Sequence, residues 1–415
     1  MDRRDALKLS NALLATGLFG ALPGSALAKA GSSAFDPIIQ YLAGADAFAD
    51  KLGCKDPALR GAFHTLVMAS LSAAYVDVFG TRVENPSWVP YLPYFLPYVG
   101  PNPDTCYNFA PVEADGIYRI SGRNGTETIS TVTMVTGGDH IGKIVGKTVG
   151  EIDRLALKTD AAGNYSFLLS AKPVPGYEGQ WFALHPKATG LMTRRVIREL
   201  SQIDGVSAIE RLDHAPARLD YTAEEVRHRL QMVADCAADT TKFALDYAQL
   251  LKNRGAADGL IIDDQTPYGG LVSQVYFFHL FALAKDEAII YESDVPASKY
   301  MSMTLFDPLI TTLDFVNHQT SLNDRQLHFD GDGRVRMVLS AVDPGAANWL
   351  DTGGWLQGGL IWRWNDARAT PKPSLTKVKL KDLKQHLPAD TRYLTADERQ
   401  AAISLRRMLY QRRVH

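Results

Sequence analysis

The feature of this 415-residue chain that most constrains its fold is an internal repeat. Residues 163–195 and residues 333–364 carry the same motifs in the same order: a glycine, a Leu-Ser-Ala sequence, a Pro-Gly pair and a tryptophan. Further along, Gly190-Leu191 and Arg194 match Gly359-Leu360 and Arg363 at identical spacing. Such a repeat indicates two related units, each with a strand, a turn, a buried tryptophan, a loop and a second strand. We therefore expect two packed β-sandwiches.

The repeat also separates scaffold from candidate chemistry. The Pro-Gly turn and the tryptophan occur in both copies, so they most simply serve the backbone bend and core packing. Asp343 and Asp351 in the second copy have no acidic counterpart in the first, which has His185 in its loop instead. We expect any chemistry among such unshared groups. In the alternative interpretation, Asp351 and Asn348 only satisfy hydrogen bonds of their own loop.

The N-terminus is typical of a secretory signal of the twin-arginine (Tat) type. Arg3 and Arg4 precede an apolar run from Leu9 to Leu22, which ends in the small-residue site Ala26-Leu27-Ala28. The run is shorter than the about 20 apolar residues that span a bilayer. We expect a periplasmic or secreted protein that is cleaved near Ala28 and has no membrane span in the mature chain.

Composition and motifs exclude several classes of function. The formal net charge of −2 argues against nucleic acid as a partner. The three cysteines are widely spaced without a Cys-x-x-Cys pair, so neither a thiol redox site nor a cysteine zinc site is indicated. No Gly-x-Ser-x-Gly, His-Glu-x-x-His or P-loop sequence occurs. No motif therefore signals a cofactor or a metal.

Residues 85–109 form a segment rich in proline and aromatic residues. Its six prolines exclude a regular helix or a central strand, so the segment must run extended over a surface. One interpretation is a strap that seals the core or a subunit interface. The other is a wall of a hydrophobic ligand pocket, in which Trp88 and Tyr94 contact the ligand.

Three blocks of the chain resemble a known family. Residues 102–126, 181–195 and 343–364 are similar, in this order, to a prokaryotic family catalogued as domain of unknown function 1214, often found with a companion family, 1254. The resemblance extends over residues 85–365. It implies a jelly-roll-like β fold with helical additions and assembly into homo-oligomers. It implies no established activity, so no catalytic residue is carried over.

The pattern of elements and the resemblance together predict the α+β class. We expect two jelly-roll-like antiparallel β-sandwich units with helical N-terminal, central and C-terminal segments. Capping boxes at Thr222 and Thr395 begin the central and C-terminal helices, and Asn124-Gly125 predicts a β-hairpin turn. The expected segments are the signal peptide (1–28), a helical N-terminal region (29–84), the first β-sandwich unit with the strap (85–215), a helical connection and linker (216–295), the second β-sandwich unit (296–370) and a C-terminal tail and helix (371–415).

The candidate site residues are those whose chemistry suits a small-molecule site. A carboxylate, histidines and a tyrosine beside aromatic walls suit proton transfer, and a guanidinium can hold an anionic group with two hydrogen bonds. In the alternative interpretation, Asp104 caps a turn and the arginines are ion-pair partners on strand faces. The candidate catalytic residues are Asp104, Tyr107, His185 and His279. The candidate substrate-binding residues are Arg119, Arg194, Tyr276, Trp88, Tyr94, Asn348 and Asp351.

Two functions are compatible with this pattern. The expected partner is a small apolar or aromatic ligand, and in the second function also a lipid, a glycan or a sister subunit. The first is an exported enzyme, a lyase, isomerase or hydrolase, that uses acid–base chemistry on a hydrophobic or aromatic small molecule. The second is a non-catalytic ligand-binding or assembly protein of the periplasm. An enzyme should bring the candidate catalytic residues together in one pocket, whereas a binding protein should leave them scattered with their hydrogen bonds satisfied.

Overall fold

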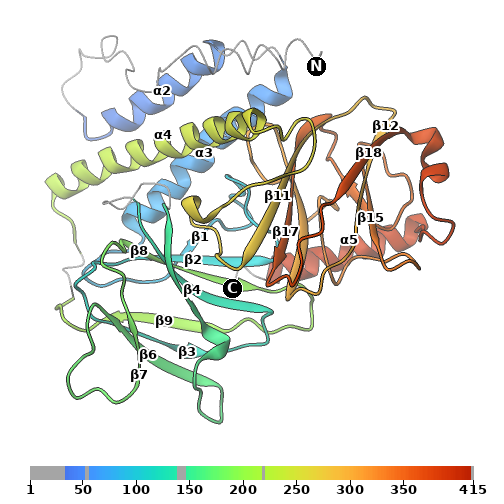
Figure 1. Ribbon diagram of the computed structural model, residues 1–415. Helices are drawn as coiled ribbons and strands as arrows, with labels where there is room; N and C mark the ends of the chain where they lie inside the picture. The colour runs from blue at the N-terminus through green and yellow to red at the C-terminus, as the bar shows by residue number, and fades with distance from the viewer. Residues whose placement is uncertain (1–32, 52–55, 138–145, 217–219, 413–415) are drawn as a thin grey trace.

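The computed structural model describes residues 33–51, 56–137, 146–216 and 220–412. The predicted signal peptide lies outside these ranges. Within them the chain forms two β units and a group of helices (Figure 1). The α+β class predicted from the sequence is confirmed.

The first β unit contains nine described strands in two sheets. The strand order is β1-β2-β8-β4-β5 in one sheet and β7-β6-β3-β9 in the other. The strands are β1 (Val89–Tyr91), β2 (Thr105–Pro111), β3 (Tyr118–Arg123), β4 (Ile129–Val135), β5 (Thr148–Asp153), β6 (Asn164–Ser170), β7 (Gln180–Ala183), β8 (Gly190–Val196) and β9 (Val206–Arg211).

The second β unit repeats this topology strand for strand. Its sheets have the orders β10-β11-β17-β13-β14 and β16-β15-β12-β18, so each strand corresponds to the strand numbered nine lower. This agreement confirms that the sequence repeat reflects two related units. The strands are β10 (Ile261–Ile262), β11 (Gln274–Ala282), β12 (Glu287–Ser293), β13 (Tyr300–Phe306), β14 (Ser321–Asn323), β15 (Val335–Ser340), β16 (Trp349–Asp351), β17 (Gln357–Asn365) and β18 (Ser374–Lys379).

The two tryptophans of the repeat occupy equivalent places. Trp181 in β7 and Trp349 in β16 each lie on a strand parallel to its neighbour, β6 or β15. The indole Nε1 of Trp181 donates to Ser170 Oγ (2.9 Å), and that of Trp349 donates to Ser340 O (3.1 Å). Each otherwise antiparallel unit thus contains one parallel pair, because the loop between the two strands returns the chain along the sheet before the second strand begins.

Each unit is a sandwich whose core lies between its two sheets. The first core contains Ile120 of β3 and Leu191 of β8, which belong to different sheets. The second core contains Met337 of β15 and Trp362 of β17, also from different sheets. Burial of the two inner faces against each other removes their apolar side chains from water and holds the sheets together.

The second unit extends beyond the predicted boundaries of 296 and 370. Strands β10, β11 and β12 lie in the segment 216–295, which was expected to be a helical connection and linker, and β18 lies in the expected C-terminal tail. The sequence of β11, QVYFFHLFA, is almost continuously apolar because α4 and the sandwich core cover it on both faces. Such a strand lacks the alternation of polar and apolar residues that predicts a strand.

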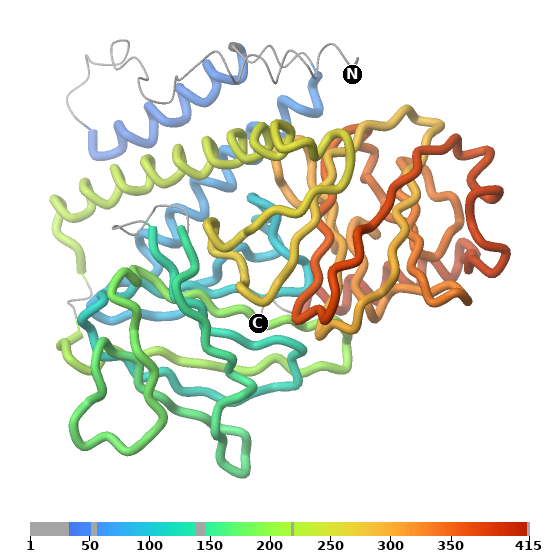
Figure 2. Tube along the Cα trace, in the orientation of Figure 1, coloured from blue at the N-terminus to red at the C-terminus, as the bar shows by residue number. Residues whose placement is uncertain are grey.

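A layer of helices covers one side of both β units (Figures 1 and 2). It consists of α2 (Asp36–Lys51), α3 (Pro57–Phe79) and α4 (Ala223–Asn253). The core of this layer includes Tyr98 from the strap and Leu309 from a loop of the second unit, so the layer joins the two units. Among the described helices, α3 alone has the length and hydropathy of a membrane span, and its buried side chains pack in this core.

The remaining helices are short or terminal. The 3-10 helices are η2 (Arg154–Ala156), η3 (Thr266–Tyr268) and η4 (Leu380–His386). Helix α5 (Ala396–Gln411) packs on the second unit, where the guanidinium of Arg406 donates to Phe315 O and Ser321 Oγ. Its last turn also reaches the first unit through Tyr410.

Candidate functional site

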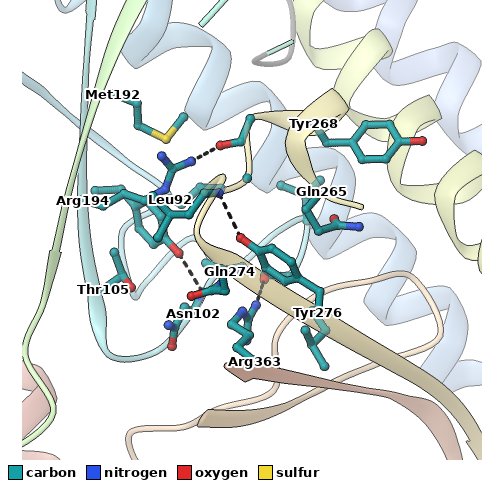
Figure 3. A pocket seen from close by; sticks show the side chains of 18 of the residues that line it. Leu92, Asn102, Thr105, Met192, Arg194, Gln265, Tyr268, Gln274, Tyr276 and Arg363 are labelled. Carbon is teal, nitrogen blue, oxygen red and sulfur yellow. Dashed lines mark hydrogen bonds between the residues drawn. The ribbon is translucent and has the colours of Figure 1, made fainter. Parts of the chain in front are cut away.

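A cavity of about 120 Å³ lies between the two β units and against α4 (Figure 3). Its main polar groups are Tyr107 of β2, Arg194 of β8, Tyr276 of β11 and Arg363 of β17. An engineered cavity of about 150 Å³ in another protein holds a benzene molecule. The cavity is somewhat smaller than that one, so it admits a small organic molecule at most.

The two arginines occupy equivalent positions of the repeat and make equivalent hydrogen bonds. The guanidinium of Arg194 donates to Thr133 Oγ1 at 2.8 Å, and that of Arg363 donates to Thr304 Oγ1 at 3.0 Å. Each arginine also crosses to the other unit. Arg194 donates to the carbonyl oxygen of Gly269, and Arg363 donates to that of Gly100 at 3.0 Å. Both glycines have positive φ angles, 80° and 70°, which glycine adopts without strain.

Two tyrosines complete the equivalence. Tyr107 pairs with Arg194 in the β2–β8 register, and Tyr276 pairs with Arg363 in the β11–β17 register. The hydroxyl of Tyr107 accepts from the backbone N–H of Asn102 (3.1 Å), and that of Tyr276 accepts from the backbone N–H of Leu271 (3.2 Å). The cavity thus combines two copies of one arginine–tyrosine subsite, one from each unit.

Both arginines are buried without a carboxylate partner. Arg194 is 7% exposed and Arg363 is 4% exposed. Within the described part of the chain, neither guanidinium lies within 4.0 Å of a carboxylate. The described cavity lining contains no Asp, Glu, His or Lys. Arg194 interacts with the Glu151 carboxyl only at longer range, so both guanidinium groups lack a direct carboxylate partner among the described residues, and an anion in the cavity would supply one.

The titration of neighbouring groups reflects the positive charge of this site. Burial raises the pKa of Glu151, on β5, and the positive charge of Arg194 opposes this rise. Burial also raises the pKa of Tyr276, and both Arg194 and Arg363 oppose the rise. The Tyr276 hydroxyl therefore keeps its proton at neutral pH and can donate a hydrogen bond to a ligand.

Aromatic and aliphatic side chains form another part of the cavity wall. Tyr247 of α4 packs edge to face on Tyr268 of η3, with ring centroids 5.2 Å apart, and stacks on Phe243 at 5.5 Å. The strap supplies Leu92 and Val99. An aromatic surface beside the arginines suits a ligand that is partly apolar.

Three of the predicted site residues, Tyr107, Arg194 and Tyr276, converge at this cavity. Arg363 also lines the cavity but was not among the predicted site residues, although it matches Arg194 in the repeat. The arginines and tyrosines of this cavity are duplicated residues, whereas the sequence pattern directed attention to the unshared ones.

Asp104 lies outside the cavity and serves the structure. Its carboxylate accepts hydrogen bonds from Tyr300 Oη (2.6 Å), Asn323 Nδ2 (3.0 Å) and Tyr410 Oη (3.1 Å). These donors come from the second unit and from α5, so Asp104 connects them to the first unit.

The two candidate histidines also lie elsewhere. His279 is buried within the second sandwich, and its Nδ1 forms a 2.6 Å hydrogen bond with Tyr291 Oη. Burial lowers the pKa of His279 to about 4, with a smaller contribution from Lys377. His185 lies in the loop before β8, where its Nδ1 accepts from the N–H of Lys187 (3.1 Å).

Three further candidates satisfy local contacts. Arg119 is exposed on β3 and pairs with Glu210 at 3.1 Å. The side-chain amide of Asn348 accepts a hydrogen bond from the backbone N–H of His328 and donates to the carbonyl oxygens of His328 and of Arg336 in β15. Asp351 accepts from Gly353 N (2.8 Å) and lies 2.9 Å from His318 Nδ1. These contacts match the alternative interpretations given above.

The proline-rich strap does line the cavity, but through other residues than those predicted. Tyr91, Leu92 and Val99 face the cavity. Trp88 instead packs on the first sandwich core, and Tyr94 packs near α5 with its ring against Phe95.

A metal site has no support in the described residues, which contain no group of three or more His, Cys, Asp or Glu side chains placed to hold an ion. The donor set of the cavity, with arginines, hydroxyls and amides, also favours an anion over a cation.

Comparison with known proteins shows a similarity of fold and no similarity to a family model or a curated protein. No protein-family model and no curated protein matches the sequence. The crystal structure of an uncharacterised protein from Burkholderia cenocepacia is similar, with a TM-score of 0.74 and 24% identity over 84% of this chain and 99% of that one. The VPA0106 protein from Vibrio parahaemolyticus gives a TM-score of 0.43 and 13% identity over 75% and 97% of the two chains. The likeness to the Burkholderia protein shows a shared fold.

Proposed function

We propose that this protein binds a small organic anion in the cavity between its β units and acts as an exported, non-catalytic binding protein. The observation that carries the proposal is the pair of buried arginines, Arg194 and Arg363, which face one cavity without a carboxylate partner among the described residues. An anionic ligand gives a guanidinium group of this cavity a charged hydrogen-bond acceptor.

The cavity wall supports an organic anion over a simple inorganic one. The rings of Tyr247 and Tyr268 and the side chains of Leu92 and Val99 offer apolar surface next to the arginines. A ligand with an apolar part removes this surface from water as its anionic group binds the guanidinium.

The placement of acid–base groups supports binding rather than catalysis. Asp104 and His279 are occupied in hydrogen bonds outside the cavity, and His185 lies in a loop away from it. Apart from the arginines, the titratable side chains of the described lining are all tyrosines. Because the pKa of Tyr276 is raised, it does not provide a base near neutral pH. The twin-arginine sequence at Arg3 and Arg4 supports export.

Titration calorimetry and thermal melting test the proposal with benzoate, propionate and glutarate, each beside its uncharged amide. We expect at least one carboxylate, but not its amide, to bind and to raise the melting temperature. Arg194→Gln and Arg363→Gln should each weaken binding about tenfold or more, because a hydrogen bond to a charged group contributes about 1.5–3 kcal/mol.

Arg119→Gln is the matched control, since it removes a guanidinium from an exposed ion pair remote from the cavity. It should leave binding unchanged. Equal affinity for the acids and their amides, or equal losses in Arg119→Gln and the cavity variants, would show that the cavity does not select an anion.

A further inference from the structure

The charge of the cavity points to more than one anionic group on its ligand. Arg194 and Arg363 are both more than nine-tenths buried, and guanidinium groups stay protonated in proteins. A monoanion leaves one of two buried positive charges without a partner. A ligand with two negative charges pairs with both.

The hydrogen bonds of the arginines leave donors for such a ligand. Each guanidinium has five N–H donors. In each arginine one terminal nitrogen binds a threonine hydroxyl and the other binds a glycine carbonyl. Within the described residues, the Nε atoms of Arg194 and Arg363 have no hydrogen-bond partner. These contacts with neutral groups fix each guanidinium while leaving it able to bind a carboxylate.

The duplication places the two donors as separate subsites. Arg194 comes from β8 of the first unit and Arg363 from β17 of the second (Figure 3). Each has its own tyrosine and its own glycine carbonyl. Thr105 and Gln274 occupy matching positions on β2 and β11, and both line the cavity. Two copies of one arginine–tyrosine subsite fit a ligand that presents the same group at both of its ends.

We propose that the cavity binds a small dicarboxylate, with one carboxylate on Arg194 and the other on Arg363. This inference rests on the proposed function, since it names the class of anion. The volume of about 120 Å³ restricts the ligand to a short chain between the carboxylates.

Calorimetry with succinate, glutarate and adipate, each beside its monoamide, distinguishes a cavity that prefers dicarboxylates from one that binds any small organic anion. An acid and its monoamide have nearly the same size and length but differ by one negative charge. We expect at least one diacid to bind about tenfold or more tightly than its monoamide, because the second carboxylate gains a charged hydrogen bond.

The cavity variants should remove this preference. In Arg194→Gln or Arg363→Gln one subsite loses its charge, so a diacid and its monoamide should bind with similar affinity. Arg119→Gln should keep the full preference. Circular dichroism of each variant checks that the fold is retained.

Gln274→Glu tests the charge argument without removing an arginine. The introduced carboxylate supplies an internal counterion at the cavity wall. We expect a higher melting temperature without ligand and a loss of diacid binding. The matched variant Gln274→Met, which adds no charge, should not raise the melting temperature.

The possible results distinguish the proposals. Equal binding of diacids and monoamides overturns the dicarboxylate while an anion-binding cavity stands. Tighter binding of inorganic phosphate than of any diacid also overturns it, because both arginines then hold one anionic group. Binding of neither carboxylates nor phosphate overturns the proposed function as well. A lower melting temperature and unchanged diacid binding in Gln274→Glu overturn the charge argument.

Discussion

Arg194 and Arg363 combine burial with access to a space that a ligand can enter. Hydrogen bonds to the hydroxyls of Thr133 and Thr304 and to carbonyls of the opposite unit hold the guanidinium groups in place. Neutral acceptors offset part of the cost of removing a charge from water, which is several kcal/mol per ion. In the proposed function, a bound carboxylate adds a charged acceptor to these neutral ones.

His279 gives a prediction for pH-dependent stability. Its folded-state pKa is about 4, below the ordinary value of 6.5, because it is buried. As pH falls from 6.5 to 4, the unfolded chain takes up a proton that the folded protein does not. The free energy of unfolding should therefore fall by about 1.4 kcal/mol per pH unit in this window through His279.

Comparison with His279→Gln isolates this contribution. Other groups with a raised pKa, such as Asp77 and Asp307, titrate near the same window, but they do so in both proteins. Urea unfolding at several pH values should show that the wild type loses up to about 3 kcal/mol relative to the variant between pH 6.5 and 4. A pH-independent difference would mean that His279 takes up its proton equally in the folded and the unfolded chain, so that burial does not lower its pKa.

Asp104 shows what could not be predicted at this scale. The sequence shows a carboxylate after Pro103 in a block rich in polar residues, which fits a catalytic group or a turn cap. Its partners Tyr300, Asn323 and Tyr410 lie 196, 219 and 306 residues away in the chain. Local sequence contains no information on such long-range hydrogen bonds, whereas Tyr107 and Arg194 were found because a family-like block and a repeat marked them.

Among the structural elements, helix starts were predicted well and a hairpin was not. The capping boxes at Thr222 and Thr395 form as predicted, with reciprocal hydrogen bonds to Glu225 and Glu398. The Asn124-Gly125 sequence does not join two paired strands, because β3 and β4 belong to different sheets. A capping box depends on residues within one turn, whereas a hairpin depends on which strand becomes the neighbour, and here the turn crosses between sheets.

The paired tryptophan strands give a prediction for β7 and β16. Both indoles donate one hydrogen bond to the matching serine of the preceding strand, but Trp349 is 8% exposed whereas Trp181 is half-buried. The hydrogen-bond loss should be similar in the two alanine variants, so their difference reports apolar burial. Trp349→Ala should cost about 3–5 kcal/mol of unfolding free energy, and Trp181→Ala should cost distinctly less.

Urea denaturation measures the loss of unfolding free energy in each alanine variant, and each variant serves as the control for the other. Equal destabilisation would mean that the shared serine contact, and not the burial of the ring, determines the role of this tryptophan in the repeat.

At the scale of the whole molecule, the duplication explains both the fold and the position of the cavity. The repeat in the sequence predicted two related sandwiches, and the strand orders agree throughout. It did not predict how the two units would face each other, because that depends on their shared helix layer and on reciprocal contacts such as Arg194 to Gly269 and Arg363 to Gly100. Because the two units face each other in this way, both copies of the arginine–tyrosine pair line one cavity.

The same contacts predict that the two units unfold together. Thr312 donates hydrogen bonds to the carbonyl oxygens of Pro97 (2.8 Å) and Pro101 (3.1 Å) in the strap, and Asp104 accepts hydrogen bonds from the second unit and α5.

Four of the six tryptophans, at positions 349, 355, 362 and 364, belong to the second unit, so fluorescence mainly reports that unit. Far-UV circular dichroism at the helix band mainly reports the helix layer. Because separating the units exposes buried polar groups on both, the two signals should show coincident urea transitions in the wild type. Asp104→Asn should shift both to lower urea by the same amount; a shift in one signal alone would mean that the units are stable independently and that the cavity between them can open without unfolding.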